Sequence, residues 1–304
     1  RPAIRGGDMS LSHLRGELRI NEPLMRYTSW RVGGPSDRYY KPADGEDLSE
    51  FLHRLPEQES ILWMGLGSNL LIRDGGFRGT TVSVHGVLDQ ISRRDGTRVV
   101  VEAGVHCARL AKLVASWGLA GGEFFAGIPG TLGGALAMNA GAWGGETWAV
   151  VESVQVIDRS GAVRSLPASA FETGYRSVIA PEPNLWFVAA ELSFAPDADG
   201  KAPERIRQMI AERKASQPVG KPSCGSVFRN PEGDHAARLI EASGLKGRRI
   251  GDAEVSTKHA NFIINRGHAR AADIESLITL VRDTVRREAN VDLIPEVRVV
   301  GEPA

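Results

Sequence analysis

The stretch AGIPGTLGGALAMNAGAWGG, residues 126–145, contains seven glycines and five alanines. A second glycine-rich stretch, GLGSNLL at 65–71, directly follows the apolar run SILWM. Glycine lets the main chain adopt positive φ and approach another molecule closely, and it costs stability inside regular elements. Main-chain N–H groups in such turns form concave sites for anions, above all where a helix begins. The first glycine-rich segment (65–71) and the second (126–145) therefore predict a backbone-lined site for a long, partly phosphorylated ligand such as a dinucleotide.

Neither segment matches a common nucleotide-binding fingerprint. The strings are not G-x-G-x-x-G and not G-x-x-x-x-G-K-[ST], so they predict neither a Rossmann domain nor a P-loop. The pattern by itself goes no further than a ligand of this general kind.

Composition excludes several classes of protein. The chain has 304 residues, of which 42% are hydrophobic and 24% charged, as is typical of a globular protein. Its 37 basic and 37 acidic residues balance, which argues against a nucleic-acid partner. No apolar run approaches the roughly 20 residues of a membrane span, and the first residues lack the apolar core of a secretory signal. We therefore expect a cytoplasmic protein whose partners are small molecules.

The cysteines and histidines also fit a cytoplasmic protein, and they indicate no metal site. Cys107 and Cys224 are far apart and form no C-x-x-C pair, so they suggest no disulfide framework and fit a reducing compartment. The seven histidines show no close metal-ligand spacing, so we expect no metal site.

The composition and the predicted elements change along the chain, and this change marks the domain organisation. Residues 1–20 are predicted to be a loosely attached lead-in, and the polar piece at 196–203 is the best domain boundary. Periodicity and capping residues predict helices within 44–56, 106–119, 203–217, 234–245 and 271–290, with Asp234 as a candidate N-cap and Gly244 as a candidate C-cap. Strands are predicted around a turn at 27–42, at 60–64, 97–104, 185–196, 259–266 and 293–301, and in a hairpin over 150–166. This order is α+β rather than strictly alternating β-α-β.

Seven strings together resemble a known family. They are YTSWRVGG (27–34), GLGSNLLIRDGGFRG (65–79), EFFAGIPGTLGGALAMNAGAWGGE (123–146), GYRS (174–177), CGSVFRNP (224–231), GLKGRRIGDAEVSTKHANFIIN (244–265) and PEVRVVG (295–301). In this order, over roughly residues 22–301, they resemble the UDP-N-acetylenolpyruvoylglucosamine reductases, flavoenzymes that complete UDP-N-acetylmuramate in peptidoglycan synthesis. The segment between Tyr175 and Lys214 is short, which resembles the class without a substrate-covering tyrosine loop.

The resemblance implies a fold, a cofactor and a reaction. It implies a two-part FAD-binding region of the PCMH or vanillyl-alcohol-oxidase type over 21–196, with subdomains at about 21–87 and 88–196, and a smaller α+β substrate-binding domain over 204–301. It implies noncovalent FAD, NADPH as hydride donor and UDP-N-acetylglucosamine enolpyruvate as substrate. We expect a monomer.

The same resemblance implies roles for individual residues. Ser226 matches the proton donor, Glu296 a glutamate that stabilises the intermediate, and Arg176 the arginine that binds the substrate carboxylate. The resemblance implies substrate contacts for Tyr175 and, at the UDP part, for Lys214, Asn230 and Lys246. Contacts to FAD fall on Gly65, Gly67, Ser68, Asn69, Leu70, Gly127, Ile128, Pro129, Gly130, Thr131, Gly133, Gly134, Asn139, Gly141 and, near a phosphate, Arg298.

Two other readings of the residues remain open at this point. One is a different FAD-dependent oxidoreductase with the same FAD-binding architecture, and the other is a nucleotide-binding paralogue without catalysis. The presence of Arg176, Ser226 and Glu296 disfavours the second reading, and CGSVFRNP with PEVRVVG disfavours the first.

Overall fold

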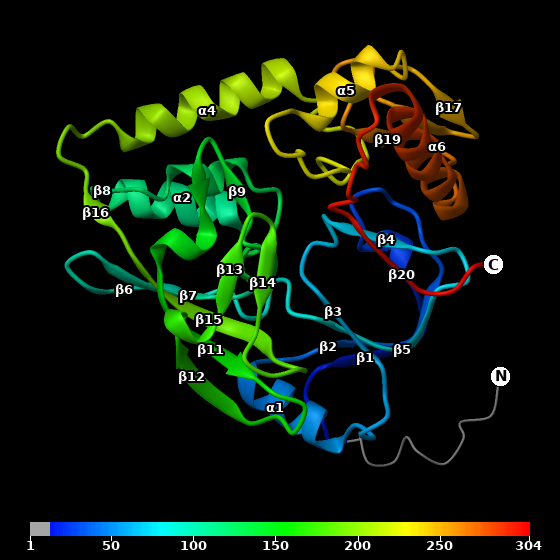
Figure 1. Ribbon diagram of the computed structural model, residues 1–304. Coiled ribbons are helices and arrows are strands. Elements are labelled where there is room, and N and C mark those ends of the chain that lie inside the picture. Colours follow the sequence, from blue (N-terminus) through cyan, green and yellow to red (C-terminus); the bar gives the residue numbers. More distant parts are fainter. Residues whose placement is uncertain (1–12) are drawn as a thin grey trace. The chain divides into compact units, whose positions relative to one another are not determined.

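The structure is a computed structural model that describes residues 13–304 (Figure 1). The predicted lead-in at 1–20 lies mostly outside the described residues. Its last part is regular rather than loose, because Glu17–Pro23 forms strand β1. Among the described residues, no helix is both long and apolar enough to cross a bilayer.

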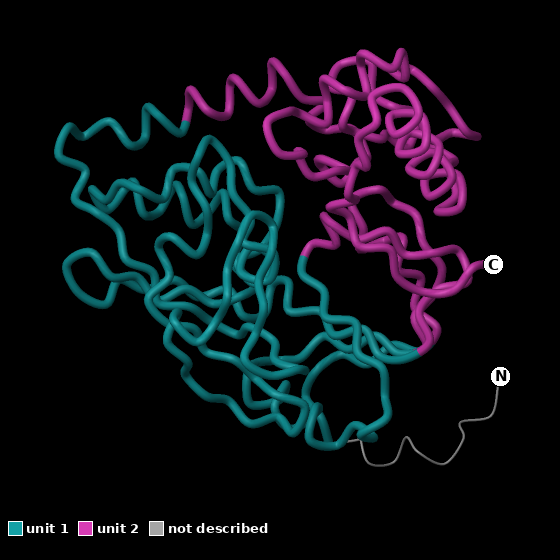
Figure 2. The backbone as a smooth tube through the Cα atoms, in the orientation of Figure 1, with its two compact units in different colours: residues 1–20, 38–65, 79–206 teal, residues 21–37, 66–78, 207–304 magenta. Residues whose placement is uncertain are grey.

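The chain forms two compact units that differ from the predicted domains (Figure 2). The first unit contains the described residues up to Ile20 together with 38–65 and 79–206, and the second contains 21–37, 66–78 and 207–304. Two N-terminal segments thus join the C-terminal unit. Trp30 explains the first of them, because its buried indole N–H donates to the carbonyl of Ile263 at 2.7 Å. Leu71 explains the second, since it lies in the same hydrophobic core as Trp30.

A five-stranded antiparallel sheet is the centre of the first unit. Its order is β12-β11-β15-β7-β6. The predicted hairpin over 150–166 is confirmed, because β11 pairs antiparallel with β12. The strands are β6 (Ile91–Asp95), β7 (Arg98–Glu102), β11 (Val151–Ile157), β12 (Val163–Pro167) and β15 (Trp186–Ser193).

Short elements surround this sheet and carry the second glycine-rich segment. The helical ones are α2 (Cys107–Ser116), η3 (Glu123–Gly127), α3 (Leu132–Met138), η4 (Thr147–Val150) and η5 (Ala168–Ala170). The strand pairs are β8 (Leu119–Ala120) with β16 (Ala195–Pro196), β9 (Gly141–Ala142) with β10 (Gly145–Glu146), and β13 (Glu172–Gly174) with β14 (Ser177–Ile179).

A second sheet has the order β1-β2-β5-β3. Its remaining strands are β2 (Pro35–Lys41), β3 (Ile61–Met64) and β5 (Phe77–Ser83). The accompanying helix α1 (Gly45–Arg54) begins after Asp44, whose carboxylate accepts the N–H of Asp47. Tyr40 and Phe51 stack in the hydrophobic core beside this sheet.

The second unit is built around one long helix. Helix α6 (Ala271–Ala289) buries an apolar stripe that includes Leu277, Val281 and Val285. Its other elements are η2 (Leu24–Arg26), β4 (Leu70–Ile72), α5 (Ala236–Ala242), β17 (Arg249–Ile250), β18 (Ala253–Val255), β19 (Ile263–Asn265) and β20 (Arg298–Val300). Helix α4 (Ala202–Ser216) begins in the first unit and continues into the second.

All five predicted helices are present as α1, α2, α4, α5 and α6. Three details were wrong. Residues 27–30 form turns rather than a strand, and the N-cap of α5 is His235, whose N–H is held by the carboxylate of Asp234. The C-cap of α5 is Ser243, and Gly244 follows it with φ 67°. Helix α3 was not predicted, because its glycine and alanine content hides any apolar periodicity.

Candidate functional site

The second glycine-rich segment is fastened by its own backbone to residues 103–107. The N–H groups of Leu132 and Gly133 donate to the carbonyls of Val105 and Ala103, both at 2.8 Å. These two amides are therefore used within the protein. Gly133 is needed for close packing, because a Cβ there would lie 3.0 Å from the Cβ of Ala103.

At other glycines of the predicted FAD set, the surroundings of a Cβ differ from one position to the next. A Cβ on Gly65 would lie 2.5 Å from Oγ1 of Thr131, so the end of the first segment packs directly on the second. A Cβ on Gly127 would overlap the ring of Trp143. By contrast, a Cβ on Gly134 would meet nothing closer than Oγ1 of Thr131 at 3.9 Å, so this exposed main chain faces open space. Such a cradle fits a cofactor bound against main chain.

The side chain of Asn139 holds the end of this segment. Asn139 is buried, ends α3 in the left-handed conformation at φ 47°, and accepts the N–H of Trp148 at 3.0 Å. Its Nδ2 donates to the carbonyl of Gly174 at 3.0 Å and to Glu146 at 3.1 Å. The amide of Asn139 thus fixes β13 and β10 to the end of α3.

Arg176 and Tyr175 occupy the turn between β13 and β14. The Arg176 guanidinium donates to the carbonyl of Gly141 at 2.8 Å and to that of Asn139 at 3.3 Å, and it lies 5.1 Å from the centre of the Tyr175 ring. The backbone of Arg176 has φ 52°, an uncommon conformation for a residue with a side chain. The structure therefore brings the predicted carboxylate-binding arginine to the carbonyls that end the second glycine-rich segment.

In the second unit, residues 226–229 and 294–298 form what we call the Ser226 strand pair. The N–H of Glu296 donates to the carbonyl of Val227 at 2.7 Å, and the N–H of Arg229 donates to that of Ile294 at 2.9 Å. Ser226 and Glu296 are both half-buried. The two extended segments share one isolated bridge, between Phe228 and Pro295, and each carries one predicted catalytic residue.

Asn261 fastens the Ser226 strand pair and was not predicted. Its Nδ2 donates to the carbonyl of Phe228 at 2.8 Å, and its Oδ1 accepts the N–H of Phe228 at 3.0 Å. The carbonyl of Asn261 accepts the N–H of Val227 at 2.9 Å. The only signal in the sequence is an asparagine inside the otherwise apolar stretch ANFII, because a buried amide there needs partners.

The first glycine-rich segment also meets this strand pair. The N–H of Arg298 donates to the carbonyl of Asn69 at 3.0 Å, and Nδ2 of Asn69 donates to the carbonyl of Glu296 at 3.1 Å. From Leu70 onward, β4 runs parallel to β20. Gly67 has φ 57°, and its left-handed turn positions Ser68 and Asn69. The side chain of Arg298 is exposed.

Cys224 lies close to these residues but is not a reactive thiol. It is buried, and burial, followed by the charge of Glu296, raises its pKa well above the ordinary value. The protonated thiol is a poor nucleophile.

The three predicted contacts to the UDP part of the substrate lie on separate elements of the second unit. Lys214 is exposed on α4, and its carbonyl accepts from Nζ of Lys258 at 2.5 Å. Nζ of Lys246 pairs with Glu241 at 2.7 Å. Asn230 is exposed, and its Oδ1 accepts the N–H of Ala236 at the start of α5, at 3.1 Å.

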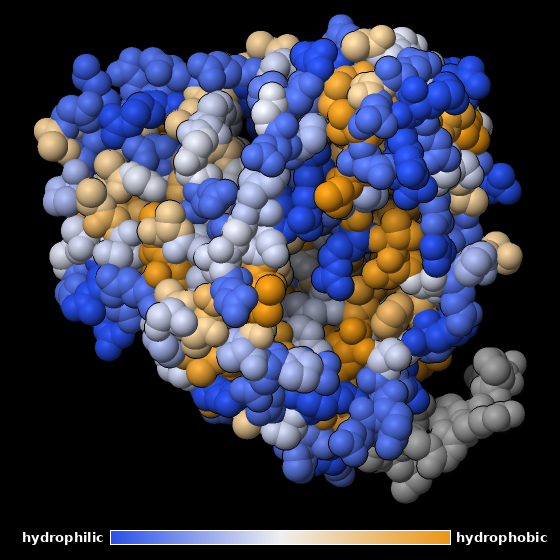
Figure 3. All heavy atoms as spheres, in the orientation of Figure 1, coloured by the Kyte–Doolittle hydropathy of each residue, from blue (hydrophilic) through white to orange (hydrophobic). Residues whose placement is uncertain are grey.

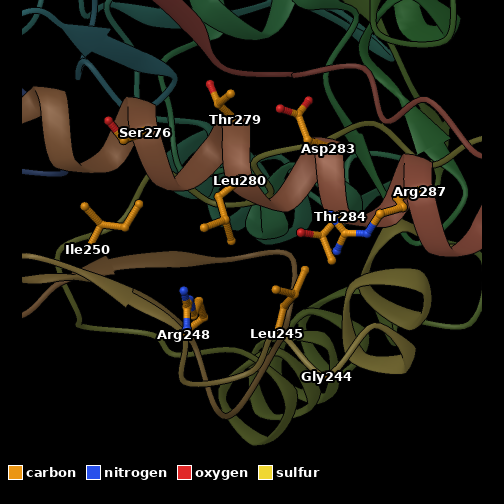
Figure 4. A pocket seen from close by; sticks show the side chains of 10 residues that line it. All are labelled: Gly244, Leu245, Arg248, Ile250, Ser276, Thr279, Leu280, Asp283, Thr284 and Arg287. Carbon is orange, nitrogen blue, oxygen red and sulfur yellow. The ribbon is translucent and has the colours of Figure 1, made fainter.

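A pocket of about 630 Å³ lies elsewhere in the second unit, between α6 and residues 244–250 (Figure 4). Leu245, Ile250 and Leu280 face one another across it, with Arg248 beside them. None of the predicted site residues lines this pocket. Within residues 13–304, no three histidine, cysteine, aspartate or glutamate side chains gather into a metal site.

Comparison with known proteins agrees with the sequence analysis. Residues 36–166 match the FAD binding domain, and residues 217–300 match the C-terminal domain of UDP-N-acetylenolpyruvoylglucosamine reductase. The chain is 58% identical to that enzyme from Alkalilimnicola ehrlichii, covering 94% of this chain and 96% of the relative. It is 54% identical to that of Nitrosococcus oceani, covering 98% and 100%.

A solved structure supports the same conclusion. The crystal structure of UDP-N-acetylenolpyruvylglucosamine reductase from Thermus caldophilus superimposes with a TM-score of 0.81 at 32% identity, covering 94% of this chain and 99% of the other. The predicted FAD-binding region followed by an α+β domain is confirmed at this level. The chain therefore belongs to the UDP-N-acetylenolpyruvoylglucosamine reductase family of FAD-dependent oxidoreductases.

Proposed function

We propose that this enzyme reduces UDP-N-acetylglucosamine enolpyruvate to UDP-N-acetylmuramate, with NADPH as the source of hydride. When bound, FAD supplies the hydride that adds to the enolpyruvyl carbon. The substrate class follows from the activity for which the relatives are named, and NADPH follows from the family resemblance. A monomeric state, a cytoplasmic location and the absence of membrane or nucleic-acid partners stay predictions.

One observation carries the proposed chemistry: Ser226 and Glu296 belong to two extended segments that are joined by backbone hydrogen bonds. Hydride addition leaves an enolate-like charge on the substrate, and a proton must then reach the adjacent carbon. The Ser226 hydroxyl donates this proton. Glu296, as a protonated carboxylic acid, donates a hydrogen bond that stabilises the charged intermediate. Donors aimed at a developing charge lower the barrier most when the protein holds them in place beforehand.

Arg176 binds the substrate carboxylate. A guanidinium has five N–H donors in a planar fork, and bonds to two carbonyls leave it capable of meeting an anion as well. Those two carbonyl bonds hold the fork in one orientation. Orientation before binding reduces the entropy lost when substrate arrives.

The residues that we assign to FAD belong to both glycine-rich segments. Gly65, Gly127, Ile128, Pro129, Gly130, Thr131, Gly133, Gly134, Asn139 and Gly141 belong to the first unit, and Gly67, Ser68, Asn69, Leu70 and Arg298 to the second. The cradle at Gly134 supports main-chain contact with the cofactor. The internal bonds of Asn139 support a role in shaping the site rather than in direct contact.

An anaerobic stopped-flow record of flavin absorbance tests this function. The purified protein is reduced with NADPH and then mixed with UDP-N-acetylglucosamine enolpyruvate. Bleaching followed by recovery of the flavin absorbance demonstrates both half-reactions. Bleaching without recovery contradicts the proposed substrate. A protein that holds no flavin contradicts the role given to residues 126–145.

A further inference from the structure

Arg205, in the first turns of α4, gathers three carboxylates of the first unit. Its Nε donates to Glu123 at 2.9 Å, Nη2 to Asp197 at 2.9 Å, and Nη1 to Asp199 at 3.0 Å. The side chains of Glu123 and Asp197 are only 10% and 2% exposed. We call these four residues the Arg205 cluster. Buried carboxylates need such a partner, so the cluster is a built arrangement rather than a chance surface pair.

Backbone amides hold each carboxylate in place. Glu123 accepts from the N–H of Gly121 at 2.6 Å, and Asp197 accepts from that of Ala202 at 2.9 Å. The hydrogen bond from Arg205 lowers the pKa of Asp199 to about 2, and its three partners raise the pKa of Arg205 itself. Asp199 and Arg205 therefore stay charged throughout the pH range in which an enzyme works.

The fold explains why these residues meet. Strands β8 and β16 pair, with Pro196 opposite Leu119. Asp197 follows β16, and Glu123 follows β8 after a short turn. Helix α4 buries only Ala202 and Ile206, and the face shown in Figure 3 is mainly hydrophilic over this helix. The cluster is thus a principal attachment of the start of α4 to the first unit.

Glu123 is also the first residue of η3, which leads into the second glycine-rich segment. The ring of Phe124 occupies the space that a Cβ on Gly145 would need, at 2.6 Å. The ring of Trp143, from the same hairpin as Gly145, covers Gly127 at the other end of η3. A shift of Glu123 would therefore move both η3 and the β9–β10 hairpin.

We propose that Arg205 is a positioning residue for the cofactor: through Glu123 it sets the place of η3 and of residues 126–145. This inference rests on the proposed function, because it assumes that residues 126–145 contact FAD. A purely structural role, in which the cluster only anchors α4, predicts lower stability without any effect on cofactor binding.

The test compares variants in the apoprotein and after addition of FAD. Glu123→Gln removes the charge of the residue that joins the cluster to η3 and leaves one acceptor oxygen for two donors, and Arg205→Met removes all three ion pairs. We expect both to raise the Kd for FAD by about 10-fold, within the range for residues coupled in one network, and to alter the flavin absorption spectrum. Arg205→Lys, which keeps the charge, should recover part of the affinity.

Two matched controls and a second readout make the test decisive. Asp199→Asn, at the exposed side of the cluster, and Arg207→Met, an exposed arginine on the same helix, should leave the Kd unchanged. Amide hydrogen exchange over 121–134 in the apoprotein should be faster in Glu123→Gln than in the parent protein. If Arg205→Met does not fold, Glu123→Gln still decides the question.

Glu123→Gln with unchanged Kd, spectrum and exchange would overturn the inference. A parent protein that holds no flavin contradicts the proposed function instead. In that case the exchange over 121–134 by itself decides whether the cluster positions this segment.

Discussion

The second glycine-rich segment, in the first unit, and the Ser226 strand pair, in the second, are built in opposite ways. The glycine-rich segment has few side chains, and its glycines allow close packing on Ala103, Trp143 and Phe124. The Ser226 strand pair is fixed by bonds between main chains and by the amide of Asn261, so that the side chains of Ser226 and Glu296 remain for chemistry. In the first region the size of a residue matters most, and in the second its functional group does. Substitutions in the second glycine-rich segment should therefore disturb packing, whereas substitutions in the Ser226 strand pair should remove a chemical function.

The largest effect is expected for Ser226→Ala. Loss of the proton donor should slow flavin reoxidation by substrate by about 10²–10⁴-fold, the usual contribution of a general acid. Flavin reduction by NADPH should be unchanged. Both rates are measured by anaerobic stopped flow, with Ser223→Ala in the same loop as the control. Normal reoxidation in Ser226→Ala would show that another group donates the proton.

The next largest effect is expected for Asn261→Ala. It leaves the buried N–H and carbonyl of Phe228 without their side-chain partner. The free energy of unfolding should fall by about 2–4 kcal/mol, because unsatisfied buried polar groups cost about 1–3 kcal/mol each. Urea denaturation measures this loss. Asn261→Asp, which keeps the acceptor but lacks the amide donor, should lose less, and equal losses in the two variants would contradict the role of Oδ1 as the acceptor of the Phe228 N–H.

A pair of glycine substitutions in the second glycine-rich segment separates the effect of packing from the effect of ligand contact. Gly127→Ala should destabilise the apoprotein by about 1–3 kcal/mol, because the added methyl overlaps the Trp143 ring. Gly134→Ala lies in α3 beside open space, so it should leave apoprotein stability unchanged or raise it by up to about 1 kcal/mol. If main chain is the ligand surface, Gly134→Ala nevertheless weakens FAD binding. Unaltered affinity in this variant would mean that the cofactor does not approach Gly134.

The smallest effect is a loss of stability in acid, to which each compact unit contributes one histidine. Burial, followed by the charge of Lys246, lowers the pKa of His259, whose Nδ1 accepts the N–H of Asn261 at 3.3 Å. Burial and His106 lower the pKa of His85. The unfolded chain protonates first, so stability is complete above the ordinary histidine pKa of about 6.5 and falls as pH drops below it.

Denaturation midpoints between pH 5 and 8 measure this slope. His259→Asn and His85→Asn should each remove part of it. A slope that survives in the double variant would assign the acid sensitivity to other groups.

The sequence predicted the helices better than the units. All five predicted helices exist; α1, α2, α5 and α6 each bury an apolar stripe, and α4, which buries only Ala202 and Ile206, was found from its terminal signals. The unit boundaries differ because Trp30 and Leu71 pack in a core formed mainly by residues more than 150 positions later, and no local pattern reports such a partner.

By itself the sequence determined that the chain has two glycine-rich segments, and it predicted that their main chain contacts a ligand. It also placed Arg176, Ser226 and Glu296 in the strings that the family shares. Only the tertiary structure decided what holds these residues. Arg205 meets Glu123 across 82 positions, and Asn261 meets Phe228 across 33. Such contacts arise when distant strands pair, so their energy depends on a geometry that exists only after the chain has folded.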